Sequence, residues 1–250
     1  MNLEPNSSAR GSTRARWACA VVLVFCVLCG AALGQTKKQR VELIVAGGTV
    51  VSMDAERRLL EDGAVAVSGD TIVAVAARSE IQARYSAGRQ IDARGKLVLP
   101  GFINGHTHVP MTLFRGLKDD VTLDVWLKDY IFPAEAKNVT EDFVRWGTRL
   151  AAAEMIRGGT TTFADMYYFE DAIAEETKAA GMRGILGETW IDFPAPDNKT
   201  EAAMAAYTEK FLQRWQGDPL IHLDSTITSG PDTLRPRYEF LLKGLPPTEF

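Results

Sequence analysis

Cysteine is scarce in this chain, and the few residues present are confined to one place. All three, Cys19, Cys26 and Cys29, lie in the N-terminal segment of the 250 residues. The remainder offers no thiolate for a metal and no cysteine nucleophile, and it needs no disulfide to fold. A metal centre or catalytic group in that remainder has to be built from imidazole, carboxylate or hydroxyl groups.

A large charge imbalance is absent as well. The chain has 28 Lys and Arg against 32 Asp and Glu, a formal net charge of −4. It therefore lacks the strongly basic character that is typical of nucleic-acid-binding proteins. An apolar content of 46% and a charged content of 24% are typical of globular proteins. We therefore expect a folded globular protein with no nucleic-acid partner.

The N-terminal segment has the pattern of a targeting signal. Arg10, Arg14 and Arg16 precede an apolar run from Trp17 to Leu33, and Ala32-Leu33-Gly34 fits a small-residue cleavage site. This pattern predicts a signal peptide over residues 1–34 and a secreted or periplasmic product with no membrane contact after cleavage. An uncleaved membrane anchor is the alternative, although the run is at the short end of the roughly 17 residues that a spanning helix needs.

The pattern of short strands and helices changes near residue 98 and predicts two parts. Residues 35–98 contain strand patterns separated by Gly and Asp turns, which we interpret as a portion of a β-sandwich. Strands alternate with helices over residues 99–250, which predicts a parallel α/β fold, the first half of a (β/α)8 barrel of TIM type. The expected strands are 41–46, 49–53, 63–67, 71–76, 97–108, 160–167, 183–190 and 220–224, and the expected helices are 126–131, 140–158, 171–180 and 200–215.

Histidine is also rare, and its distribution is the most informative feature of the sequence. Two of the three histidines, His106 and His108, end the apolar run that begins at Leu97. Side chains alternate along a strand, so these two imidazoles face the same way. Two neutral imidazoles that converge on one point can bind a divalent metal. We therefore expect His106 and His108 to be metal ligands rather than packing residues.

Several ordered motifs give the sequence a resemblance to a known family. These motifs are Pro-Gly-Phe-Ile-Asn-Gly-His-Thr-His at 100–108, Pro-Met-Thr-Leu-Phe-Arg-Gly at 110–116, Ile-Phe-Pro-Ala-Glu at 131–135 and Gly-Thr-Thr-Thr-Phe-Ala-Asp-Met-Tyr at 159–167. With them, the sequence from about Val41 onward resembles the amidohydrolase superfamily, in the branch that holds the S-adenosylhomocysteine and methylthioadenosine deaminases and the triazine hydrolases.

The resemblance implies a metal-dependent hydrolase that cleaves a carbon–nitrogen bond other than a peptide bond. It implies one divalent metal, zinc or alternatively iron, with His106 and His108 as the first two ligands. It assigns Glu135 to the ribose hydroxyls of a nucleoside substrate, whereas a solvated carboxylate after Pro133 is the alternative from the sequence alone. The family's later ligands and its proton-shuttling glutamate have no counterpart in these residues, so we expect the chain to be a fragment that is inactive by itself.

Two positions depart from the nucleoside-deaminase pattern. Asp224 stands where that branch has a substrate-contacting histidine, and His222 lies two residues earlier on the same expected strand face. Glu188 stands where some of these deaminases have an arginine. We expect His222 and Glu188 to contact substrate, with a strand-filling histidine and an ion pair as their respective alternatives. For Asp165, at the end of a strand, we expect a structural hydrogen-bonding role.

These departures leave more than one function open. Hydrolytic deamination of an aminopurine nucleoside or a similar heterocycle, with metal-activated water as nucleophile, is the favoured interpretation. Hydrolysis of a cyclic amide or a chloro-heterocycle is the second, and a truncated, non-catalytic paralogue is the third. Members of the family often form dimers, so a homodimer that takes a small-molecule substrate is a further expectation.

Overall fold

The computed structural model describes residues 37–191 and 194–223, and the chain divides into two compact units between Pro100 and Gly101. The predicted signal peptide, and Asp224 with the end of its strand, lie outside the described residues. Among the described residues, no helix has the length and apolarity needed to cross a bilayer.

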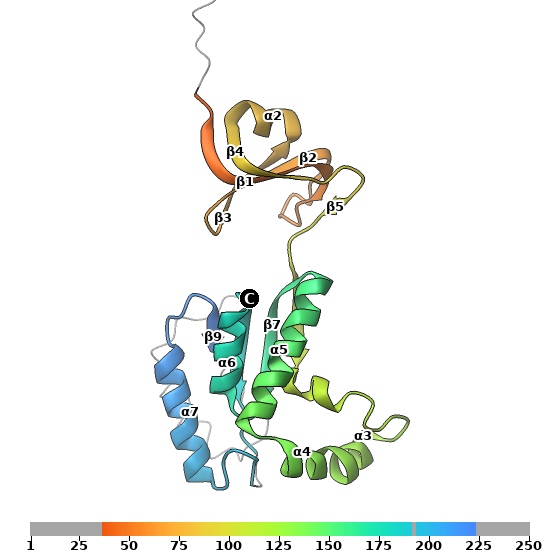
Figure 1. Cartoon of the computed structure of the whole chain (residues 1–250), viewed down its shortest axis with the longest axis vertical. Coiled ribbons are helices and arrows are strands. Elements are labelled where there is room, and N and C mark those ends of the chain that lie inside the picture. Colours follow the sequence, from red (N-terminus) through yellow and green to blue (C-terminus); the bar gives the residue numbers. More distant parts are fainter. Residues whose placement is uncertain (1–36, 192–193, 224–250) are drawn as a thin grey trace, which may run out of the picture. The chain divides into compact units, whose positions relative to one another are not determined.

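The first unit is a mixed sheet whose strand order is β3-β2-β1-β4, with β5 paired to β1 (Figure 1). Its core is small and holds Val41, Ile44 and Ile81. Its elements are β1 (Gln39–Val51), β2 (Leu59–Ser68), β3 (Thr71–Ala77), α2 (Arg78–Arg84), β4 (Tyr85–Asp92) and β5 (Leu97–Val98). The β-sandwich remains a prediction, because the described residues form one sheet here.

The first strand of this unit corrects one expectation. The Gly47-Gly48 pair was expected to end a strand, but β1 runs through it without a break. The ladder to β2 shifts register on both sides of Gly48, and Gly47 has a φ of +88° that only glycine adopts readily. The glycines therefore form an irregularity inside one long strand, as glycines in strands often do.

The second unit is a parallel sheet with the strand order β6-β7-β8-β9 (Figure 1). The α/β prediction with a parallel sheet is confirmed, while the closed barrel remains a prediction. Its strands are β6 (Phe102–Thr107), β7 (Thr160–Tyr167), β8 (Arg183–Glu188) and β9 (Ile221–Leu223), and its helices are η1 (Val109–Phe114), α3 (Leu123–Val125), η2 (Trp126–Ile131), α4 (Phe132–Asn138), α5 (Glu141–Gly158), α6 (Glu170–Ala179) and α7 (Glu201–Trp215).

Helices α5 and α7 begin at the threonine caps that their sequences indicate, whereas α6 begins at Glu170 without a side-chain cap. Thr140 accepts a hydrogen bond from the Phe143 N–H at the start of α5, and Thr200 does the same at the start of α7, which satisfies N–H groups that have no partner within the helix. The helix expected over residues 126–131 would end just before Pro133. Instead Pro133 lies in the first turn of α4, where its missing N–H costs nothing.

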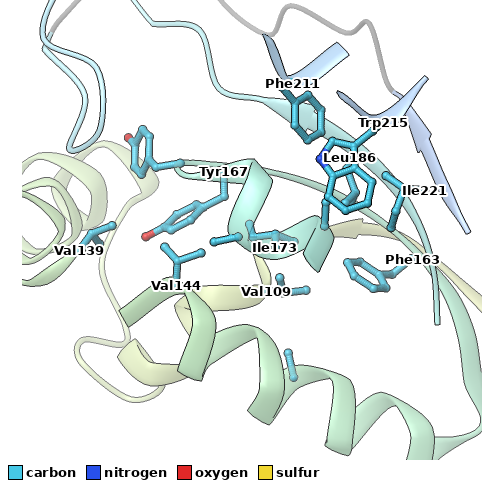
Figure 2. Close-up of a cluster of buried hydrophobic side chains, with 14 of the residues drawn as sticks. Val109, Val139, Val144, Phe163, Tyr167, Ile173, Leu186, Phe211, Trp215 and Ile221 are labelled. Carbon is cyan, nitrogen blue, oxygen red and sulfur yellow. The ribbon is translucent and has the colours of Figure 1, made fainter. Parts of the chain in front are cut away.

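The core of the second unit lies between the sheet and its helices. Figure 2 shows Phe163, Leu186 and Ile221, one from each of β7, β8 and β9, directed into the same cluster. Each side chain is at most 1% exposed, and burying one of this size contributes about 1.5–3 kcal/mol to stability. This packing fixes the sheet, so the side chains at its strand ends occupy defined positions.

Candidate active site

The candidate site lies at the carboxyl ends of β6, β7 and β8. Parallel strands present these ends along one edge of a sheet, which is where α/β proteins commonly bind ligands. His106 lies near the end of β6 and His108 directly follows that strand; Met166 and Tyr167 end β7, and Thr189 directly follows β8. All five line a single cavity of about 510 Å³.

The two imidazoles lie close enough to each other to contact a common cation. The Nε2 atoms of His106 and His108 lie 3.3 Å apart. The Nδ1 atom of His108 lies 2.6 Å from the carbonyl oxygen of Met166. Because a carbonyl can only accept, Nδ1 carries the proton and Nε2 of His108 keeps its lone pair.

This separation fits a tetrahedral metal. Two nitrogens bound at about 2.0–2.1 Å in tetrahedral geometry lie about 3.3–3.4 Å apart, close to the observed spacing. Within the part of the chain that the structure describes, no group of three or more His, Cys, Asp or Glu side chains is arranged to hold a metal. Among the described residues, His106 and His108 could therefore supply two ligands, one fewer than the three protein ligands that catalytic zinc usually has.

Asp165 secures the backbone between and after the two histidines. Its Oδ1 accepts hydrogen bonds from the Val109 N–H at 2.7 Å and from the Thr107 hydroxyl at 2.5 Å. The side chain is buried, and burial raises the pKa of Asp165 to about 7, while the two hydrogen bonds oppose that shift. The structural hydrogen-bonding role expected for Asp165 agrees with these contacts.

Glu135 lies on the cavity wall as a buried carboxylate. It is 5% exposed, so the alternative of a solvated carboxylate does not hold. The Tyr167 hydroxyl donates to Oε1 at 2.8 Å, and the Tyr168 hydroxyl approaches Oε2 at 3.4 Å. Burial raises the pKa of Glu135, and the two phenols counteract that shift. Burial and the negative charge of Glu135 raise the pKa of both tyrosines.

Most of the remaining cavity wall is apolar and aromatic. It comes from the segment α3–α4 and from the chain after the strands, and includes Met111, Trp126, Leu127, Ile131, Phe132 and Ile191. Few polar groups line the cavity: the imidazole pair, Glu135 with its two tyrosine partners, and Thr189. A mostly apolar cavity with a few placed polar groups is typical of a small-molecule site.

Glu188 and His222 are not among the described residues that line this cavity. Glu188 is the buried last residue of β8, and its Oε2 accepts a hydrogen bond at 3.1 Å from the N–H of Glu170 at the start of α6. Burial and the nearby Asp197 carboxylate raise its pKa well above the ordinary range. His222 is exposed and pairs in register with Ile185. Contact of Glu188 and of His222 with substrate stays a prediction.

Sequence reasoning missed the two tyrosines. Tyr167 lies within the motif at 159–167, which assigns it no role, and Tyr168 directly follows that motif. The position of Tyr167 indicates a place at the site, because it is the last residue of a strand that ends beside the histidine pair. No sequence signal pairs it with Glu135, which is 32 residues away.

The fold and the site together define an α/β protein with a parallel sheet and a pair of imidazoles that could bind a metal at the strand ends. The chain belongs to the amidohydrolase family, whose model matches residues 97–232. The deaminase and triazine-hydrolase resemblance is confirmed by the relatives and solved structures that the chain matches.

Two curated relatives are named 5-methylthioadenosine/S-adenosylhomocysteine deaminases. The chain is 49% identical to the one from Syntrophus aciditrophicus over 185 residues and 50% identical to the one from Syntrophobacter fumaroxidans over 184 residues. Each match covers 74% of this chain but only 42% of the relative. The chain thus spans less than half the length of these relatives.

Solved structures with bound zinc are similar to the chain as well. An adenosine deaminase from Xanthomonas campestris is 35% identical with a TM-score of 0.78, covering 83% of this chain and 48% of that one. An atrazine chlorohydrolase from Arthrobacter aurescens has a TM-score of 0.63 at 23% identity, covering 72% and 45%. The second likeness concerns the fold alone.

Proposed function

We propose that this chain forms part of a metal-dependent amidohydrolase that deaminates an aminopurine nucleoside or a similar heterocycle by hydrolysis. The observation that carries the proposal is the His106–His108 pair, whose Nε2 atoms are spaced for one tetrahedral ion beside a cavity with one buried carboxylate. The deaminase names of relatives at about half identity support the reaction class.

Zinc is the metal that we propose, because it accepts imidazole ligands in tetrahedral geometry and because two solved neighbours contain it. Iron is the alternative. When bound, such an ion lowers the pKa of a coordinated water toward neutrality and so supplies a hydroxide nucleophile. The further ligands and the proton-transferring group would come from outside the described residues.

The residues of this chain would bind and orient the substrate. The apolar wall from Trp126 to Phe132 would contact the flat heterocycle and exclude bulk water. Glu135 would accept hydrogen bonds from the sugar hydroxyls, since an ionised carboxylate is an acceptor only. Met166 would hold the His108 ring through its carbonyl oxygen.

An ammonia-release assay tests this proposal. It is run on the 250-residue chain and on the product of any longer reading frame, with 5-methylthioadenosine, S-adenosylhomocysteine and adenosine as substrates. We expect ammonia release only where the missing ligands are supplied. Activity only toward triazines or cyclic amides would favour the second function, and a reading frame that ends at Phe250 with no turnover would favour a non-catalytic paralogue.

Zinc titration of the 250-residue chain gives a second test. With two imidazole ligands we expect weak, substoichiometric binding that is lost in His108→Ala. His222→Ala is the matched control, because it removes an exposed histidine that does not line the cavity. Tight one-to-one binding would contradict a two-ligand site, and equal effects of the two variants would contradict the assignment of His108.

A further inference from the structure

We infer that Tyr167 is a positioning residue for Glu135, and that its hydroxyl holds one carboxylate oxygen so that the other faces the cavity. The inference rests on the proposed function, because the role of Glu135 toward substrate hydroxyls belongs to that proposal. Its evidence is the hydrogen-bond geometry of the described residues, which stands independently of the metal.

The two tyrosines contact Glu135 unequally. The distance of 2.8 Å from the Tyr167 hydroxyl to Oε1 is typical of an O–H···O hydrogen bond. The distance of 3.4 Å from the Tyr168 hydroxyl to Oε2 is long for such a bond. Tyr167 therefore engages Oε1 fully, whereas Oε2 keeps capacity for another donor, such as a substrate hydroxyl.

Tyr167 is itself firmly held. It is 3% exposed and belongs to the core of the second unit, where Figure 2 shows it beside Val144 and Ile173. Its ring centroid lies 6.3 Å from that of His108 and 4.8 Å from that of Tyr168. Because these neighbours restrict rotation of the Tyr167 ring, its hydroxyl is a donor in a fixed position.

The end of β7 therefore orients both polar features of the cavity. The carbonyl oxygen of Met166 accepts from His108, and the next residue, Tyr167, donates to Glu135. Consecutive residues of one strand thus set the separation between the imidazole pair and the carboxylate. A substrate that spans the two would meet groups placed by the same strand end.

Electrostatics agree with this arrangement. A carboxylate buried in an apolar wall is pushed toward its neutral form, and a neutral carboxyl is a weaker acceptor. The Tyr167 hydrogen bond opposes the rise in the pKa of Glu135. Burial raises the pKa of Tyr167, so the phenol keeps its proton and remains a donor.

Tyr167→Phe tests the inference, with Tyr168→Phe as the matched control from the adjacent residue. Carbon-13 NMR of glutamate-labelled chain follows the titration of Glu135, assigned by its loss in Glu135→Gln. We expect Tyr167→Phe to raise the pKa of Glu135 clearly more than Tyr168→Phe does. Equal effects of the two variants, or no change in Tyr167→Phe, would contradict the positioning role.

A second probe keeps the test decisive if Tyr167→Phe does not fold. Replacing Tyr167 by 3-fluorotyrosine retains the shape and makes the phenol a stronger donor, so the pKa of Glu135 should fall; an unchanged pKa would contradict the inference. In an active protein, Tyr167→Phe should raise KM for the nucleoside about tenfold with little change in kcat, because a charged hydrogen-bond acceptor loses its fixed orientation. If the unmodified protein never releases ammonia, the proposed function fails while the NMR comparison still decides the role of Tyr167.

Discussion

Gly147→Ala probes the packing that supports the two imidazoles. Gly147 lies on α5, and a Cβ atom at this position would be 2.6 Å from both the Cα and the carbonyl oxygen of Pro110. Pro110 is buried in η1, two residues after His108. Both nearest atoms belong to the backbone, so a side chain cannot rotate away, and either α5 or η1 has to move.

The change in the free energy of unfolding of Gly147→Ala is the sum of two opposed effects. Overpacking of this kind typically costs about 1–3 kcal/mol, whereas alanine is favoured over glycine inside a helix by up to about 1 kcal/mol. We therefore expect a net loss of about 1–2 kcal/mol in the free energy of unfolding. Gly158→Ala is the matched control, because nothing lies within 4 Å of a Cβ at that end of the same helix.

Urea unfolding followed by tryptophan fluorescence measures the stability of both variants, and nitrogen-15 NMR of the histidine rings reports the His108 tautomer. Gly147→Ala should lower stability and disturb the hydrogen bond from His108 to Met166, while Gly158→Ala should do neither. If Gly147→Ala is as stable as Gly158→Ala and leaves the His108 signals unchanged, the packing of α5 on Pro110 does not position the histidine segment.

Three further substitutions test other contacts. Asp165→Ala should cost about 1–3 kcal/mol in urea unfolding, because it leaves the buried Val109 N–H without an acceptor; Asp165→Asn, which keeps an oxygen, should cost less, and equal losses would contradict this account. Thr140→Ala should cost about 1 kcal/mol through loss of the cap on α5, and an unchanged melting temperature would exclude that contribution. The pKa of Glu188 is raised in the folded chain, so protonated Glu188 stabilises the fold at acidic pH, and this stabilisation is lost as pH rises above the ordinary glutamate range. Glu188→Gln should therefore make the free energy of unfolding less dependent on pH above that range. Parallel stability–pH curves for the two proteins would refute the raised pKa of Glu188.

Local patterns predicted those elements whose signals lie within a few residues. Thr140 followed by acidic residues and an amphipathic run predicted α5, and the structure places the cap at that residue. The His106–His108 spacing likewise placed both rings on one face at a strand end. Alternation and capping act over a few residues, so a single sequence contains all the information that they need.

The remaining features depend on contacts between distant residues. Glu188 is a carboxylate at the carboxyl end of β8, a position that suggests a pocket residue, yet its partner is the N–H of Glu170 at the start of α6. The pairing of Tyr167 with Glu135 also joins residues far apart in the chain. Gly47 and Pro133 locally favour breaks, but the ladder to β2 continues past Gly47 and Pro133 lies in the first turn of a helix, where proline is tolerated.

The carboxyl groups around the start of α6 have a calorimetric consequence. Asp165, Glu170 and Glu188 are buried with raised pKa values, so the folded chain holds protons that the unfolded chain releases near neutral pH. Folding in this region therefore takes protons up from the solvent. The heat measured on unfolding should then vary with the ionisation enthalpy of the buffer. The slope of that dependence gives the number of protons released on unfolding.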